Sequence, residues 1–140
     1  EFKVHTDKAG LNLVFLLAPT STTDRVELIA NNASGFVYLV SVTGVTGVKA
    51  DLNYSLETLA GEIKSATGLP VGVGFGVSSP EQVETIAEYA DAVIVGSAIV
   101  RIIEEHGNDS NTLLKELSGF IGSLSGACDK PGLKLKEKAK

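Results

Sequence analysis

Residues 69–83 have the sequence LPVGVGFGVSSPEQV, which joins a short apolar run to a glycine-containing turn and a helix start. Ser79 can cap this helix, Pro80 suits its first position, and Gln82 completes a capping box. The apolar run before the turn shows no alternation of apolar and polar residues, as expected for a strand buried on both faces of a parallel sheet. The stretch therefore predicts one strand–turn–helix unit.

The same pattern occurs along the whole chain. Near-continuous apolar runs cover residues 11–17, 36–42, 69–75 and 92–95. Helix-like stretches follow them at residues 21–30, 55–67, 79 onward and 98–105, and a terminal stretch covers residues 112–124. Gly68 suits the C′ position that ends the second helix. Strands that alternate with helices require right-handed crossovers and a parallel sheet, so the order predicts an α/β fold.

Composition limits the class of protein. A chain of 140 residues, 44% hydrophobic and 21% charged, is typical of one soluble globular domain. The net charge of −5 argues against a nucleic-acid partner, which would select a basic face. No apolar run reaches the 18 residues of a membrane span, and the single Cys128 forms no internal disulfide. The first residues lack Met and signal-peptide anatomy, so we expect the chain to begin inside a longer polypeptide or to be processed.

The end of the chain differs from the rest in composition. Residues 129–140 hold five of the 12 basic residues. Such charge blocks are typical of disordered tails, so we assign residues 1–128 to the domain and 129–140 to a disordered tail or a remnant of expression. A basic docking tail is the alternative.

Glycine-bearing segments follow three of the apolar runs, at residues 41–48, 74–78 and 96–98. Chemistry in parallel α/β sheets lies at the carboxyl ends of the strands. Glycine allows backbone N–H groups to approach an anion, and the helix that begins near Ser97 adds unpaired N–H groups, a dipole and a hydroxyl. The three segments together predict a phosphate site built from backbone amides. Each alone could be an ordinary turn, and Gly74-Phe75-Gly76 is no dinucleotide fingerprint, because Ser79 stands where the third glycine would be.

The same segments are similar to a known family. Residues 36–47 resemble the sixth strand and following loop of tryptophan synthase α subunits, and residues 73–83 resemble the seventh strand and helix. Residues 90–100 resemble the eighth strand, and residues 13–22 the fifth. The resemblance implies a parallel (βα)4 half of a TIM (β/α)8 barrel, with strands five to eight and the C-terminal helix.

This resemblance implies an activity and its site. The family cleaves indole-3-glycerol phosphate to indole and glyceraldehyde 3-phosphate by a retro-aldol reaction in tryptophan biosynthesis. The positions that match those binding the substrate phosphate are Gly47, Gly76, Gly96 and Ser97. The positions that match the substrate pocket and the mobile loop that contacts the catalytic aspartate are Tyr38, Phe75 and Thr46. Plant indole-3-glycerol phosphate lyases share these motifs and stay an alternative.

The acid–base residues implied by the resemblance, a glutamate on the second strand and a nearby aspartate, precede the first residue of this chain. No carboxylate here replaces them: most fall on predicted helices, Asp91 precedes a strand at the opposite end of the sheet, and Asp51 is the only acid near the glycine-bearing segment at residues 41–48. His5 and His106 have no partner at the spacing of a triad or a metal site. We therefore expect no metal, no cofactor and no activity from this chain alone.

A half barrel has two open edges and an exposed inner face. We expect this chain to pair with the missing N-terminal half-barrel, to pair with a second copy of itself, or to close as an open sheet. The resemblance implies a tryptophan synthase β subunit as partner of the intact enzyme, and a cytoplasmic or plastid-stroma location. One alternative is a non-catalytic self-associating half-barrel that binds phosphate. Another is a histidine-pathway isomerase, against which residues 40–47 speak.

Overall fold

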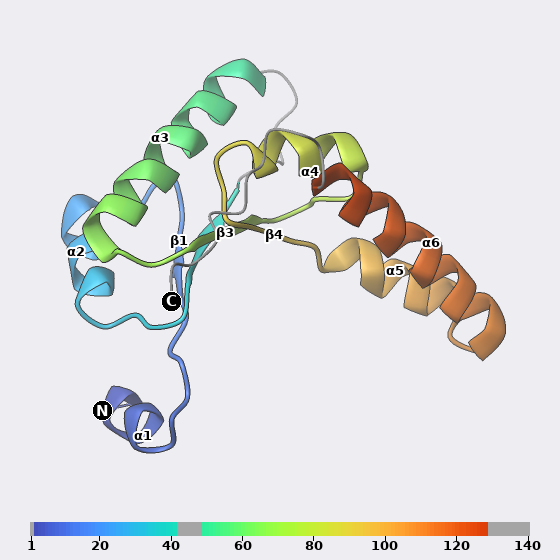
Figure 1. Cartoon of the computed structure of the whole chain (residues 1–140), viewed down its shortest axis with the longest axis horizontal. Helices are drawn as coiled ribbons and strands as arrows, with labels where there is room; N and C mark the ends of the chain where they lie inside the picture. The colour runs from blue at the N-terminus through green and yellow to red at the C-terminus, as the bar shows by residue number, and fades with distance from the viewer. Residues whose placement is uncertain (1, 42–48, 129–140) are drawn as a thin grey trace, which may run out of the picture.

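The computed structural model describes residues 2–41 and 49–128, with the side chains of residues 2–41 and 56–128. Its helices and strands alternate after an N-terminal helix (Figure 1). The strands are β1 (Phe15–Leu17), β2 (Val37–Val40), β3 (Val71–Gly74) and β4 (Ala92–Ile94). The helices are α1 (Phe2–Lys8), α2 (Thr23–Ala30), α3 (Lys49–Thr67), α4 (Pro80–Ala87), α5 (Ser97–His106) and α6 (Ser110–Cys128).

The four strands form one parallel sheet in the order β1-β2-β3-β4. Each strand therefore pairs with the next one along the chain, as successive strands of a (β/α)8 barrel do. The prediction of a parallel α/β fold is confirmed. The carboxyl ends of all four strands lie at the same end of the sheet, its carboxyl edge. β1 and β4 are the two outer strands.

The core lies between one face of the sheet and helices α2, α3 and α4. Val37 and Leu39 of β2 and Val71 and Val73 of β3 are fully buried in one cluster with residues of these helices, among them Ile29, Ala60, Ile63, Val83 and Ile86. Burying one such side chain contributes about 1.5–3 kcal/mol. The alternate residues face the other way: Leu16 is 56% exposed and Tyr38 is half-buried. One face of the sheet is thus covered by these helices. The other face is exposed at Leu16 of β1 and half-buried along β2, whereas all four residues of β3 are buried, as predicted for a strand covered on both faces.

Helices α5 and α6 form a hairpin that extends away from the sheet beyond β4 (Figure 1). α6 packs against α4 and α5, and α5 itself has no buried residue. Asp109 caps α6 by accepting from the Thr112 hydroxyl at 2.6 Å and from the Asn111 N–H at 3.1 Å. The Thr112 hydroxyl, followed by the backbone N–H groups of Thr112 and Asn111, lowers the pKa of Asp109. Within residues 2–41 and 49–128, no helix is long and apolar enough to cross a membrane.

Helix boundaries follow local signals where such signals exist. The capping box before α4 is confirmed: the Ser79 hydroxyl accepts from the Gln82 N–H at 3.4 Å, and the Gln82 side chain accepts from the Ser79 N–H at 3.2 Å. Gly68 has a φ of +67° just after α3, which confirms its C′ position.

α3 begins at Lys49, before the predicted start at Ser55, because no Gly or Pro interrupts residues 49–55. α1 was not predicted, and the tail at 129–140 lies outside the described residues.

A polar contact joins α3 to the amino ends of β3 and β4. The Asp91 carboxylate accepts from the Val71 N–H at 2.8 Å and lies 3.0 Å from Lys64 Nζ. Lys64 Nζ also donates to the Tyr89 carbonyl oxygen at 2.9 Å. Asp91 therefore lies at the end of the sheet opposite the loops that follow β3 and β4, which confirms its predicted place and gives it a structural function.

Replacing Asp91 with Ala should destabilise the fold by about 1–3 kcal/mol, because it removes the acceptor of the buried Val71 N–H. Asp91→Asn keeps an acceptor oxygen and loses only the half-exposed ion pair, so it should cost less than about 1 kcal/mol. Denaturant unfolding of both variants checks this order. Equal destabilisation by the two substitutions would contradict the assignment of the Val71 bond as the main contribution.

Candidate functional site

The loops after β3 and β4 leave the sheet side by side. Gly74 and Ile94 are register partners at the ends of these strands. Gly76 and Gly96 each lie two residues beyond this pair. Because the strands are parallel, both loops begin at the same edge of the sheet (Figure 1).

Glycine at position 74 is required by the close approach of β4. A Cβ built on Gly74 would lie 2.4 Å from the carbonyl oxygen of Ile94 and 2.7 Å from its Cβ. The backbone of β4 therefore occupies the space that any side chain at position 74 would need. At Gly72 the limit is softer, since a Cβ there would meet the end of the Ile94 side chain at 3.0 Å.

The chain turns sharply after Gly74. Phe75 has a φ of 145°, the only positive φ of a non-glycine residue in the described part of the chain, and Gly76 has a φ of 72°. Such a conformation costs a non-glycine residue about 1–3 kcal/mol, so surrounding contacts must hold it. One contact comes from Ser41, whose side-chain hydroxyl donates to the Phe75 carbonyl oxygen at 3.3 Å. The Phe75 ring itself is 59% exposed.

The amino end of α5 has the properties of an anion site. Gly96 is its N-cap, supplies no side-chain hydrogen bond, and no acidic residue lies in the first turn. The Gly96 carbonyl oxygen accepts from the Ile99 and Val100 N–H groups, so the helix begins with the N–H groups of Ser97 and Ala98 still directed outward. The helix dipole adds positive potential at this end. A Cβ at Gly96 would meet nothing within 4 Å, so the space in front of it is open.

The neighbouring helix offers a contrast. Two N–H donors at the start of α4, those of Ser79 and Gln82, already bond within the capping box. Glu81 adds a negative charge to the first turn of α4. Of the two helices that follow the paired loops, α5 is the one whose amino end is left for an anion.

The predicted site residues fall into three groups. Phe75, Gly76, Gly96 and Ser97 are brought together at the carboxyl edge of β3 and β4. Tyr38 lies on the less covered face of β2, in register with Gly72. Thr46 and Gly47 lie outside the described residues.

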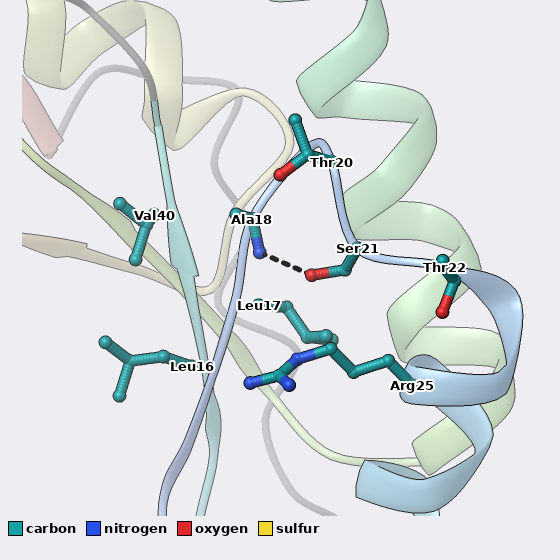
Figure 2. Close-up of a pocket in the computed structure, with 8 residues that line it drawn as sticks. All are labelled: Leu16, Leu17, Ala18, Thr20, Ser21, Thr22, Arg25 and Val40. Carbon is teal, nitrogen blue, oxygen red and sulfur yellow. Dashed lines mark hydrogen bonds between the residues drawn. The ribbon is translucent and has the colours of Figure 1, made fainter.

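A surface depression of about 430 Å³ lies at the carboxyl ends of β1 and β2 (Figure 2), and none of its lining residues belongs to the two glycine loops. Leu16 and Val40 contribute apolar side chains from the two strands, and Arg25 contributes a guanidinium from the first turn of α2. The remaining lining residues are Leu17, Ala18, Thr20, Ser21 and Thr22. The Ser21 hydroxyl accepts from the Ala18 N–H at 3.0 Å and so fixes the connection that forms one rim (Figure 2).

Sequence patterns did not single out Leu16, Val40 or Ser41. The two apolar residues are indistinguishable in sequence from the neighbours that fill the core. Ser41 gave a weak signal, since it is a small polar residue inside the apolar run at residues 36–42. In the described part of the chain it is the polar residue with a buried side chain, 1% exposed.

Other polar groups do not add chemistry to this edge. Within the described residues, no group of three or more His, Cys, Asp or Glu side chains could hold a metal ion. The Tyr89 hydroxyl is buried without a hydrogen-bond partner in that part of the chain, and its ring packs against the core. Burial, followed by the charge of Glu57, raises the pKa of Tyr89.

The four parallel βα units, with their glycine loops at one edge, define half of a (β/α)8 barrel. Solved structures agree. The chain is similar to the tryptophan synthase of Mycobacterium tuberculosis with a TM-score of 0.74 and 36% identity, covering 91% of this chain and 46% of that one. It is similar to the tryptophan synthase subunit alpha of Campylobacter jejuni with a TM-score of 0.74 and 30% identity, covering 84% of this chain and 46% of that one.

A model of the family described as tryptophan synthase alpha chain matches residues 1–128. The tryptophan synthase alpha chain of Geobacter sp. (strain M21) is 46% identical over 124 residues, which are 89% of this chain and 46% of that one. The corresponding chain of Solibacter usitatus is 49% identical over 117 residues, 84% of this chain and 43% of that one. The chain belongs to the tryptophan synthase alpha chain family, which confirms the resemblance, and it spans about half the length of the curated relatives it matches.

Replacing Gly74 with Ala should destabilise the fold by about 1–3 kcal/mol, because the added Cβ overlaps the β4 backbone. The same shift moves the Phe75–Gly76 turn away from the amino end of α5, so binding of inorganic phosphate should weaken as well. Gly61→Ala in α3 is the control: a Cβ there meets nothing within 4 Å, and alanine should stabilise the helix by about 0.5–1 kcal/mol. Thermal unfolding and phosphate titration measure both effects. A Gly74→Ala variant as stable as the Gly61→Ala variant would contradict the close approach of β3 and β4.

Proposed function

We propose that this chain supplies the phosphate-binding half of a tryptophan synthase α-type lyase. The reaction is the retro-aldol cleavage of indole-3-glycerol phosphate to indole and glyceraldehyde 3-phosphate. The observation that carries the proposal is the pairing of the Phe75–Gly76 turn with the uncapped amino end of α5 at one edge of the sheet. Membership of the family supports the same reaction class.

The phosphate group is bound mainly by backbone donors in this proposal. Gly76, Gly96 and Ser97 supply N–H groups, Ser97 adds its hydroxyl, and Gly47 contributes from the loop after β2. Hydrogen bonds to a charged group contribute about 1.5–3 kcal/mol each, more than bonds between neutral groups. The α5 dipole adds to them without placing a cationic side chain in the site.

The indole part of the substrate lies against aromatic and apolar side chains. Tyr38 and Phe75 line the pocket, and Thr46 belongs to the loop that closes it and contacts the catalytic aspartate. The side chains of Leu16 on β1 and Val40 on β2 lie near Tyr38 and extend this apolar surface toward the depression at the carboxyl end of β1. Flat aromatic rings gain from such contacts both by area and by stacking.

The acid–base step requires residues that this chain does not supply. General acid–base catalysis contributes about 10²–10⁴-fold per group, so a chain without both groups is expected to turn over little substrate. The partner that completes the site is an N-terminal half-barrel or, failing that, a second copy of this chain. A tryptophan synthase β subunit is the partner of the completed enzyme.

A second candidate is a non-catalytic half-barrel that binds phosphate and self-associates. Exposed apolar side chains near both outer strands favour it. Leu16 on β1 is 56% exposed, and Val100 and Ile103 on α5 are 51% and 45% exposed. In either candidate the phosphate site is the same, and only the partner and the chemistry differ.

Mixing this chain with a polypeptide that supplies barrel strands one to four should generate indole release from indole-3-glycerol phosphate. Neither polypeptide alone should release indole, since the phosphate site and the acid–base residues lie on different halves. A spectrophotometric indole assay measures the result. Indole release by this chain alone would contradict the absence of the catalytic acids, and a mixture that binds phosphate but stays inactive would favour the non-catalytic candidate.

Gly96→Ala tests whether phosphate binds at the amino end of α5. The backbone at Gly96 has a φ of −123° and a ψ of −75°, outside the regions that alanine prefers, but a Cβ there meets no protein atom. Stability should therefore fall by no more than about 1–2 kcal/mol, and the variant should still fold. The methyl group would occupy the space in front of the α5 amino end, so phosphate affinity should fall by about tenfold or more, equivalent to about 1.4 kcal/mol. Calorimetric titration with glycerol 3-phosphate measures this.

Gly126→Ala in α6 is the matched control for Gly96→Ala, because a Cβ there also meets nothing within 4 Å but lies on a helix away from the loops. Its phosphate affinity should equal that of the unaltered chain. Equal affinities for all three proteins would sink the proposed place of the phosphate.

A further inference from the structure

Ser41 makes two hydrogen bonds to consecutive carbonyl groups of the neighbouring chain segment. Its N–H donates to the Gly74 carbonyl oxygen at 3.0 Å, and its hydroxyl donates to the Phe75 carbonyl oxygen at 3.3 Å. In a regular strand, successive carbonyls point toward opposite neighbours. Here both point toward β2, because the φ of 145° at Phe75 and 72° at Gly76 rotates the peptide that joins these two residues.

The direction of one carbonyl fixes the direction of the N–H in the same peptide. A trans peptide is planar, with its C=O and N–H on opposite sides, and no cis peptide occurs in the described residues. With its carbonyl directed at Ser41, the 75–76 peptide directs the Gly76 N–H away from β2. The sheet order places β4 on that other side of β3, where Gly96 and Ser97 lie.

The backbone preferences of Phe75 and Gly76 do not by themselves fix the orientation of this peptide. Gly76 moves between positive and negative φ at small cost, and Phe75 already occupies an unfavourable region. A flip of the peptide would replace the Gly76 N–H by a carbonyl oxygen, which repels an anion. It would also leave the Ser41 hydroxyl, 1% exposed, without the acceptor that it now has, which is unfavourable for a buried donor.

We propose that Ser41 is a positioning residue of the phosphate site: its buried hydroxyl holds the 75–76 peptide in the orientation that directs the Gly76 N–H toward the phosphate. This inference rests on the proposed function, since it assumes an anion between the two loops. The hydroxyl does not touch the phosphate. It keeps a donor in place before binding, so that no reorientation is needed when the anion arrives.

Ser41→Ala in the full chain tests the inference. Loss of one net hydrogen bond corresponds to about fivefold weaker binding of inorganic phosphate and of glycerol 3-phosphate. In the ligand-free protein, the ¹H–¹⁵N signal of the Gly76 amide should shift or broaden, because the peptide then samples both orientations. A purely structural role would lower the melting temperature and leave both readouts unchanged in the folded protein.

Ser123→Ala is the matched control. The Ser123 hydroxyl donates to the Phe120 carbonyl oxygen at 2.7 Å within α6, so the same kind of bond is lost far from the loops. Phosphate affinity and the Gly76 signal should not change. Ser41→Cys, nearly the same size with a weaker donor, should give an intermediate loss of affinity and keeps the test available if the alanine variant does not fold.

The failures can be told apart. A Ser41→Ala protein with unchanged phosphate affinity and an unchanged Gly76 signal overturns the inference and leaves the proposed function intact. An unaltered chain that binds neither phosphate probe overturns the proposed function, and the positioning role with it. A loss of affinity in Ser123→Ala equal to that in Ser41→Ala would also overturn the inference, because the effect would then be nonspecific.

Discussion

The contact between β3 and β4 at Gly74 and Ile94 is the constraint on which the candidate site depends. The β4 backbone lies so close to Gly74 that no side chain fits there. Two strands held at this distance in parallel register send their following loops out at the same height, two residues after the pair. Gly76 and the amino end of α5 are neighbours for this reason. The site is thus a consequence of strand pairing, and the glycines around it have different functions: Gly74 allows the pairing, whereas Gly96 leaves space in front of a helix.

The two ends of the sheet are treated differently. At the amino end, Asp91 satisfies the Val71 N–H, and Lys64 links Asp91 to the Tyr89 carbonyl. At the carboxyl end, α5 begins without a side-chain cap and Phe75 holds an unfavourable φ. A domain selected for stability alone would cap that helix, as the chain does at α4. Unsatisfied donors and local strain at one edge, with satisfied contacts at the other, are typical of a scaffold that keeps one edge for binding.

Much of this fold is local and therefore visible in the sequence. Buried strands appear as apolar runs, and the capping box at Ser79 and the C′ glycine at position 68 depend only on residues a few positions apart. The predicted edge of the sheet and the place of Asp91 follow from the βα order. What the sequence did not reveal depends on contacts distant in the chain. The bond from Ser41 to Phe75 spans 34 residues. The positive φ of Phe75 could not be predicted either, because phenylalanine rarely adopts such a conformation. The exposed face of Leu16 depends on which strands stand beside β1, and a single apolar run contains no such information.

In the proposed enzyme, phosphate binding and acid–base catalysis belong to different halves of the barrel because they depend on contacts of different range. A phosphate site made of backbone amides needs only paired strands, their loops and one helix end. Most of these parts lie within residues 71–106, and Ser41 and Gly47 follow β2 in the sequence. Its geometry is set by bonds between neighbouring strands, including those from Ser41. Acid–base groups must instead face the substrate from another side of the barrel, so their placement requires the ring of strands to close. In the proposed enzyme, a four-stranded half would therefore keep the binding determinants for the phosphate and lack those for the cleavage, and completing the barrel would add catalysis to a phosphate site that the half already contains.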